Sequence, residues 1–315
     1  MRAFQSALSI LVFFLAGATP SAIADGSFYD VPPPGKLVDL GGYRLHINCQ
    51  GMGSPAVILD AGLGDWSSHW TAVQNLLKTD TLVCSYDRAG YGWSDPGPRP
   101  RDSQRIVAEL HSLLEKAEVA PPYLLVGHSF GGLNMRLFAS TFTGEVAGLV
   151  LVEASHPESL PYQRNEAGTA PSTSPSNQMM VVHPVETEAL PVPPEAQPAI
   201  NDNLLRTKSR VTSRGEYRAL GNSVLELQRS RPFGDLPLTV LSRGKREWPY
   251  GEDGDIKEKN WQLQQMELTQ LSSLSHYIVA THSGHHIHID EPGVVAGAVR
   301  EMISEERRES ASLVR

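Results

Sequence analysis

Short apolar runs alternate along most of this chain with segments in which apolar residues recur every three or four positions. Five of the runs have the continuous apolar character of strands that are buried on both faces. They lie at residues 55–60, 81–86, 123–126, 148–153 and 236–241. Helical spacing follows between them, as at residues 70–77 and 106–114. This alternation predicts an α/β fold with a mostly parallel sheet and helices on both faces.

Three further strands and two further helices complete the predicted core. Residues 36–40 and 43–49 have the pattern of an antiparallel pair around a Gly-Gly turn, and residues 277–280 that of a last strand. Helical spacing returns at residues 261–271 and 294–303. Together these elements predict an eight-stranded, mostly parallel sheet flanked by helices.

The regular pattern breaks after the strand at 148–153. From residue 156 to about residue 200 the chain is rich in Pro, Ser, Thr and Glu, and helical spacing returns only near 216–227. We expect residues 156–235 to form a cap or lid inserted between two parts of one core, 25–155 and 236–315. A disordered linker is the alternative.

Residues 1–24 have the three parts of a signal peptide. Arg2 gives a basic start, residues 7–18 are apolar, and Ala22-Ile23-Ala24 fits the cleavage site. The apolar part is too short for a stable membrane anchor. We expect cleavage near Ala24 and export to the periplasm or the medium.

Charge limits the class of partner. The formal net charge is −8, and loss of Arg2 with the leader leaves 26 basic against 35 acidic residues, or −9. No basic stripe is visible, so we expect no nucleic-acid partner. A small neutral or cationic molecule is the easier substrate to accept. The sequence leaves the oligomeric state open.

Two cysteines, Cys49 and Cys84, lie in predicted strands. If those strands are neighbours, a disulfide is geometrically possible, and an exported protein would meet an oxidising compartment. Two buried free thiols are the alternative.

The most informative motif is Gly127-His128-Ser129-Phe130-Gly131, between the strand at 123–126 and a helical segment at 132–138. A strand, a tight turn and a helix are the setting in which G-x-S-x-G forms a nucleophile elbow, which lifts a serine hydroxyl above the sheet edge. The outer glycines fit places where a Cβ would clash and where unusual dihedrals are needed. Ser129 is therefore the candidate nucleophile.

A serine hydroxyl needs a base to take its proton. His285 follows Gly284 in the turn after the last predicted strand, which puts it at the same sheet edge as Ser129. His286 and His288 are expected to line the pocket or to face solvent. These histidines have no recognisable metal-ligand spacing, so we expect no metal site here.

Three motifs in order resemble the α/β-hydrolase fold family over about residues 36–306. Residues 60–64 (Asp-Ala-Gly-Leu-Gly) stand where the family often has His-Gly-x, and residues 86–94 look like its D-R-x-G-x-G-x-S turn. Gly284-His285, followed by Asp290 and Pro292, is similar to its G-H-x-x-x-x-[DE]-x-P ending.

The resemblance implies an oxyanion hole made by the backbone N–H groups of Leu63 and Phe130. Ala61 replaces the usual histidine, which removes one side chain and leaves the backbone donor available.

Four further residues flank these motifs. Trp66 and Trp93 either wall the pocket or pack in the core. Asp87 and Arg88 are expected to brace their loop as an internal ion pair.

Two carboxylates qualify as the acid that orients His285. Glu153 ends the strand after the elbow helix, a place used by some haloalkane dehalogenases and lipases of this fold. Glu247 stands in the more widely used turn after the next strand. We favour Glu153, because Asp is the usual residue in that turn and the surroundings of Glu247 are highly charged. Glu247 is the alternative.

These residues predict hydrolysis of carboxylic esters through an acyl-serine intermediate, with no metal or organic cofactor. Amide, lactone, thioester or C–C bond hydrolysis, or cofactor-free perhydrolysis, are alternatives on the same residues. Serine at the elbow argues against epoxide hydrolases and dehalogenases, which need a carboxylate nucleophile. The least favoured hypothesis is that the chain has this fold but is a binding protein without catalytic activity.

Overall fold

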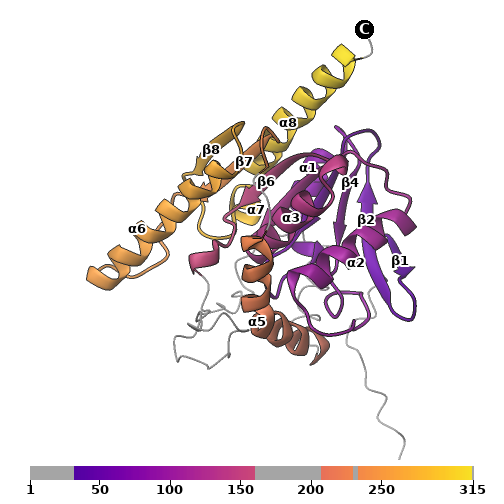
Figure 1. Cartoon of the computed structure of the whole chain (residues 1–315), viewed down its shortest axis with the longest axis horizontal. Coiled ribbons are helices and arrows are strands. Elements are labelled where there is room, and N and C mark those ends of the chain that lie inside the picture. The colour runs from indigo at the N-terminus through magenta and orange to yellow at the C-terminus, as the bar shows by residue number, and fades with distance from the viewer. Residues whose placement is uncertain (1–31, 160–206, 230–232, 314–315) are drawn as a thin grey trace, which may run out of the picture.

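The computed structural model of the chain describes residues 32–159, 207–229 and 233–313 (Figure 1). The expected signal peptide and most of the expected cap lie outside these residues. Within them, no helix has both the length and the apolar character needed to cross a bilayer.

An eight-stranded sheet forms the centre of the fold, in the order β1-β2-β4-β3-β5-β6-β7-β8. The first two strands pair antiparallel with each other, β2 is antiparallel to β4, and the remaining pairs are parallel. The predicted sheet is confirmed. The strands are β1 (Lys36–Asp39), β2 (Arg44–Gln50), β3 (Ala56–Asp60), β4 (Val83–Tyr86), β5 (Tyr123–His128), β6 (Val146–Val152), β7 (Leu238–Arg243) and β8 (Ser275–Ala280).

Helices cover both faces of the sheet (Figure 1). On one face, α1 (Thr71–Leu77), α7 (Ile287–Asp290) and α8 (Pro292–Leu313) share a core with alternate strand residues such as Val57 and Leu59. On the other, α2 (Ser103–Lys116) and α3 (Phe130–Thr141) pack with α5 (Thr207–Gln228) around residues such as Ile58. Each fully buried aliphatic side chain contributes about 1.5–3 kcal/mol, which explains the continuous apolar runs.

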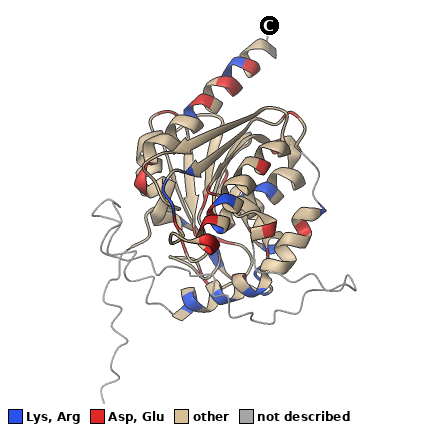
Figure 2. Cartoon of the chain, turned by 90° about the vertical axis from the view of Figure 1, so that its left-hand side faces the viewer, with Lys and Arg blue, Asp and Glu red and all other residues tan. Residues whose placement is uncertain are grey.

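Three helices are longer than their apolar spacing predicts. The helix expected near 216–227 is α5, which begins at Thr207. The helix expected at 261–271 is α6 (Glu252–Glu267) followed by the 3-10 turn η4 (Leu268–Leu271), and α8 continues ten residues past residue 303. Much of α6 and the end of α8 lie outside the core, where periodic burial gives no signal. Figure 2 shows acidic and basic residues interspersed along the projecting end of α8.

A disulfide joins the antiparallel strands β2 and β4. Cys49 and Cys84 face each other in the register of this pair and their sulfur atoms are bonded. The alternative of two free thiols is therefore wrong.

Candidate active site

Ser129 stands alone between β5 and α3, in the turn that the motif predicts. Its backbone has φ 50° and ψ −117°, a positive-φ conformation that is costly for any residue with a side chain. The N–H of Ser129 donates to Val152 O (3.1 Å) and its carbonyl accepts from Ser155 N (3.0 Å). These bonds hold the strained turn against the end of β6 and leave Ser129 half-buried.

The outer glycines of the elbow are explained by crowding. A Cβ on Gly127 would lie 2.6 Å from Gly131 O, and a Cβ on Gly131 would lie 2.5 Å from Asp60 O. No larger residue fits where strand, helix and the end of β3 meet. The expected unusual dihedrals are not theirs, because the positive φ belongs to Ser129 itself.

His285 and Glu153 meet at the same edge of the sheet. His285 Nδ1 lies 3.3 Å from Glu153 Oε2, and the imidazole is 30% exposed whereas the carboxylate is fully buried. Glu153 follows β6 directly and also has a positive φ, 46°. An accessible imidazole held by a buried carboxylate is the arrangement that general-base catalysis requires.

Glu153 receives more hydrogen bonds than the sequence suggests. Its Oε1 accepts from the backbone N–H of Arg243 (2.7 Å), and its Oε2 accepts from Arg243 Nη1 (2.8 Å) and Trp261 Nε1 (2.9 Å). Burial raises the pKa of this carboxyl, but the His285 hydrogen bond and the charges of His285 and Arg243 outweigh it, and the pKa falls below its ordinary value. The carboxylate therefore stays ionised beside the imidazole.

Arg243 and Trp261 were not predicted as site residues. Both lie in elements whose patterns indicated only a buried strand and a helix, and neither belongs to a motif. Arg243 also bonds Glu258 (3.0 Å), so its buried charge is shared between two carboxylates.

Glu247 lies beside His285 but contacts its backbone. Its Oε1 accepts the N–H of His285 (2.9 Å), and the residue is exposed. In this geometry Glu247 holds the loop, whereas Glu153 holds the imidazole.

The loops that carry Ser129 and His285 are in direct contact through His128. His128 Nε2 lies 3.0 Å from the carbonyl oxygen of His285, and the two rings are 4.7 Å apart. Across the described residues, no hydrogen bond joins Ser129 Oγ directly to the imidazole; such bonds often tighten only when substrate binds. Ser129 Oγ lies 3.5 Å from Ser155 Oγ, a neighbour that no motif predicted.

Leu63 and Phe130 supply the N–H groups that the resemblance assigns to the oxyanion hole. The loop of residues 61–64 packs against both sides of the elbow, since a Cβ on Gly62 would lie 2.9 Å from His128 Nδ1 and one on Gly131 would lie 2.7 Å from Ala61 O. Phe130 is the first residue of α3, whose N–H has no acceptor within the helix. In the described residues, neither N–H group donates a hydrogen bond to a backbone carbonyl in a turn or loop.

A group of buried imidazoles lies behind His285. His288 is fully buried against the rings of Trp70 (4.4 Å) and His128 (4.3 Å), so the expectation that it lines the pocket or faces solvent is wrong. Burial, reinforced by the neighbouring imidazoles, holds the pKa of His288 and of His128 well below the ordinary value, and both are neutral. His286 is half-buried, with Nε2 4.0 Å from Asp65 Oδ2.

Asp87 and Arg88 brace their loop, but through other partners than each other. Asp87 pairs with His46 (2.9 Å) and accepts the N–H groups of Ser67 and Trp93. Arg88 pairs with Asp60 and with Glu216 (both 2.8 Å). The predicted direct ion pair is therefore wrong, because two nearer carboxylates surround the guanidinium.

The two tryptophans differ in burial. Trp66 is 1% exposed and packs in the core against His69. Trp93 is half-buried and packs on His46, with ring centroids 4.8 Å apart.

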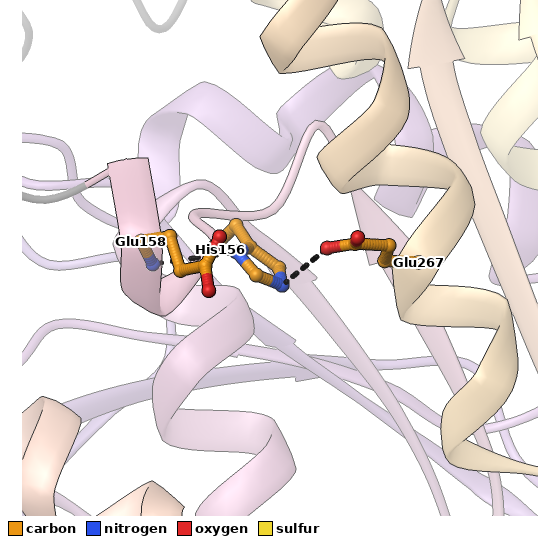
Figure 3. A group of neighbouring side chains, drawn as sticks. All are labelled: His156, Glu158 and Glu267. Atoms are coloured by element: carbon orange, nitrogen blue, oxygen red, sulfur yellow. Dashed lines mark hydrogen bonds and ion pairs between the residues drawn. The ribbon is translucent and has the colours of Figure 1, made fainter.

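A separate group of possible metal ligands lies on the surface. His156 stands between Glu158 and Glu267, with Nε2 3.6 Å from a Glu267 oxygen (Figure 3). Both carboxylates are exposed. In the described residues, no hydrogen bond or ion pair joins these three side chains to the Ser129 elbow. Exposed ion pairs of this kind are common without a metal.

Comparison with models of known protein families assigns the chain to a family. The model of the "Alpha/beta hydrolase family" matches residues 45–298. The chain belongs to the alpha/beta hydrolase family. This family member is 27% identical over 267 residues to the uncharacterised protein YqjL of Bacillus subtilis, a match that covers 84% of this chain and 90% of the relative. It is 26% identical to an AB hydrolase superfamily protein of Gibberella zeae, over 79% of this chain and 86% of the relative.

Solved structures of several activities share this fold. An esterase from Thermogutta terrifontis matches with a TM-score of 0.58 and 16% identity, over 86% of this hydrolase-family chain and 98% of that one. The enol-lactonase of Burkholderia xenovorans LB400 matches with a TM-score of 0.60 and 17% identity, over 85% of this chain and 100% of the lactonase. The epoxide hydrolase CorEH matches with a TM-score of 0.63 and 15% identity, over 86% of this chain and 98% of that enzyme. At these identities the likeness concerns the fold, and the chemistry has to be argued from the site.

Proposed function

We propose that this alpha/beta hydrolase is a serine hydrolase that cleaves carboxylic esters through an acyl-serine intermediate. One observation carries the proposal: a strained serine stands on an elbow at the sheet edge where a buried carboxylate holds an accessible imidazole, with Nδ1 and Oε2 3.3 Å apart. Serine at this position, where a carboxylate nucleophile would be required, is the argument against epoxide hydrolysis.

The reaction proceeds in two balanced halves. His285 takes the hydroxyl proton as Ser129 Oγ attacks the ester carbonyl carbon, and the carbonyl oxygen becomes an oxyanion held by the N–H groups of Leu63 and Phe130. The intermediate collapses as His285 returns the proton to the departing alcohol, which leaves an acyl-serine. Water, deprotonated by His285, then attacks the acyl carbon and releases the acid, and the proton goes back to Ser129. Glu153 stays ionised throughout and stabilises the imidazolium.

Export is a second part of the proposal. The signal-peptide pattern at residues 1–24 and the disulfide between Cys49 and Cys84 both fit an oxidising compartment outside the cytosol. The partner we propose is a small ester-type molecule.

The function is tested with a fluorophosphonate probe and p-nitrophenyl esters of increasing chain length. Wild-type protein should become labelled at Ser129, as located by peptide mass spectrometry, and should hydrolyse at least one ester. Ser129→Ala should lose the label and at least about 10³-fold in kcat, since the nucleophile is removed. Ser155→Ala is the matched control for the neighbouring hydroxyl and should still carry the label. Absence of labelling together with absence of ester hydrolysis in the wild type would contradict the proposal.

A further inference from the structure

Arg88 is a buried cation at the junction of three parts of the fold. Its side chain is 1% exposed. Nη1 donates to Ala61 O and Asp60 Oδ1 (2.6 and 2.8 Å), and Nη2 donates to Gly62 O (2.7 Å). The guanidinium also lies over the ring of Phe130, 5.5 Å from its centroid. Arg88 therefore contacts both segments that carry the proposed oxyanion donors.

The bond to Gly62 O controls the direction of the Leu63 N–H. The carbonyl of Gly62 and the N–H of Leu63 belong to one planar trans peptide unit, so they point in opposite directions. Gly62 O is held by Arg88 Nη2 and also accepts the N–H of Asp65 (3.2 Å). As long as this carbonyl faces Arg88, the Leu63 N–H faces the other way. A rotated peptide would remove the donor from the site.

The far side of Arg88 is held by Glu216, a residue of the helix α5 that the chain inserts between β6 and β7. Glu216 is fully buried, and its two oxygens accept from Arg88 Nε (2.8 Å) and Nη2 (3.1 Å). Tyr91 Oη donates to the same carboxylate (2.9 Å). This bidentate pair sets the plane of the guanidinium, and with it the directions of Nη1 and Nη2.

α5 also packs closely against the core beside the Arg88–Glu216 pair. A Cβ on Gly90 would lie 1.9 Å from Thr212 Oγ1, so only glycine lets α5 approach the loop that contains Gly90. Thr212 is one helical turn before Glu216, on the same face. Docking of α5 and pairing of Glu216 with Arg88 therefore occur together.

We propose that Glu216 is a positioning residue: through Arg88 it holds the Gly62–Leu63 peptide in the orientation that an oxyanion donor needs, so that seating of the inserted helix and formation of the oxyanion hole are one event. This inference rests on the function proposed above. It gives α5 a positioning role in the proposed reaction.

The test compares Glu216→Gln with Glu109→Gln. Glu109, on α2, is the matched control, because it is the buried partner of another arginine, Arg101 (2.7 Å). Among the described residues, no hydrogen bond or ion pair joins that pair to residues 61–64. Both substitutions remove one carboxylate charge from a buried arginine pair. We expect Glu216→Gln to lower kcat for the best p-nitrophenyl ester about 10- to 100-fold with KM within about threefold, because the oxyanion develops in the transition state and the tetrahedral intermediate but is absent from the bound substrate. Glu109→Gln should keep kcat within about threefold.

A second readout is inhibition by a trifluoromethyl ketone, which becomes a hemiketal oxyanion on the serine. Its inhibition constant should rise in Glu216→Gln in parallel with the loss of kcat/KM, and remain near the wild-type value in Glu109→Gln. A merely structural role of Glu216 would lower the melting temperature and leave both quantities unchanged in the folded fraction.

Three outcomes decide the inference. Equal kcat and inhibition constants in folded Glu216→Gln and Glu109→Gln overturn it, as does a loss confined to KM. If Glu216→Gln does not fold, the test uses Tyr91→Phe, which removes one hydrogen bond to the same carboxylate. An unchanged kcat in Tyr91→Phe then overturns the inference. A wild type without esterase activity or probe labelling contradicts the proposed function instead, so the two failures are distinguishable.

Discussion

Two residues at the site, Ser129 and Glu153, have strained backbone conformations with positive φ. Among the described residues other than glycine, positive φ occurs at Glu118, Ser129 and Glu153. Two of these three carry the proposed chemistry. Such conformations cost about 1–3 kcal/mol each and persist where surrounding contacts enforce them. Ser129 is held by its bond to Val152 O at the end of β6, and Glu153 by its bonds with Leu241 and Arg243 of β7. The neighbouring strands therefore keep both residues in these conformations.

The assignment of the acid is tested by two matched substitutions. Glu153→Gln should lower kcat for ester hydrolysis about 10³- to 10⁴-fold, because the amide cannot stabilise the imidazolium and misorients His285. Glu247→Gln should stay within a few-fold of the wild type, since its amide oxygen still accepts the N–H of His285. Circular dichroism shows whether each variant is folded. A large loss in Glu247→Gln with a folded, active Glu153→Gln would reverse the assignment.

At the scale of elements, the inserted helix α5 is fastened to the start of α2. Glu226 Oε2 accepts the N–H of Gln104 (2.8 Å), and Ser223 Oγ accepts the N–H of Ser103 (2.9 Å). Both N–H groups belong to the first turn of α2, where the helix itself offers no acceptor. Asp102 caps the same turn through Arg105 N (3.1 Å), so two carboxyls share one helix end.

This crowding predicts a pH dependence of stability. Burial and the charge of Asp102 raise the pKa of Glu226 to about 7, despite the bond from Gln104 that lowers it. A carboxyl with a raised pKa binds its proton more tightly in the folded state, so its contribution to stability falls as the pH rises from its unfolded value, about 4.3, toward 7. Glu226→Gln should therefore reduce the decrease in melting temperature between pH 5 and pH 8.

The control for this measurement is Glu309→Gln, at an exposed position near the end of α8. It should leave the pH profile of the wild type unchanged, because the charge of an exposed surface carboxylate contributes little to folding stability. A Glu226→Gln profile that coincides with the wild type would show that the ionisation of Glu226 is not coupled to folding.

At the scale of the whole molecule, the disulfide closes the first half of the sheet. It joins residues 35 apart in sequence, on β2 and β4, and the chain-entropy relation for a loop of that length gives about 3–4 kcal/mol. Cys49→Ala with Cys84→Ala should lower the free energy of unfolding by this amount in a denaturant titration. The melting temperature should then no longer respond to reducing agent, whereas that of the wild type should. A wild-type protein with two free thiols after denaturation without reductant would refute the bond.

The local pattern of the sequence predicted most of this architecture. The eight strands, their mainly parallel order and the elbow at Ser129 follow from apolar periodicity and from glycines that permit close packing, which are properties of neighbouring residues. His285 was located by its place after the last strand, because the carboxyl ends of parallel strands meet at one edge. The extent of α6 and α8 was underestimated, since their ends bury no apolar face.

What the sequence determined by itself is the order of the elements and the residue types delivered to the sheet edge. Only the tertiary structure decided which groups pair there: Glu153 rather than Glu247 reaches the imidazole, His288 is buried, and Arg88 finds Glu216 128 positions away. The physical reason is one of range. Periodic burial is encoded within a few turns of chain, whereas a hydrogen bond depends on the placement of two distant backbones to within a fraction of an ångström, and the packed sheet and helices set that placement.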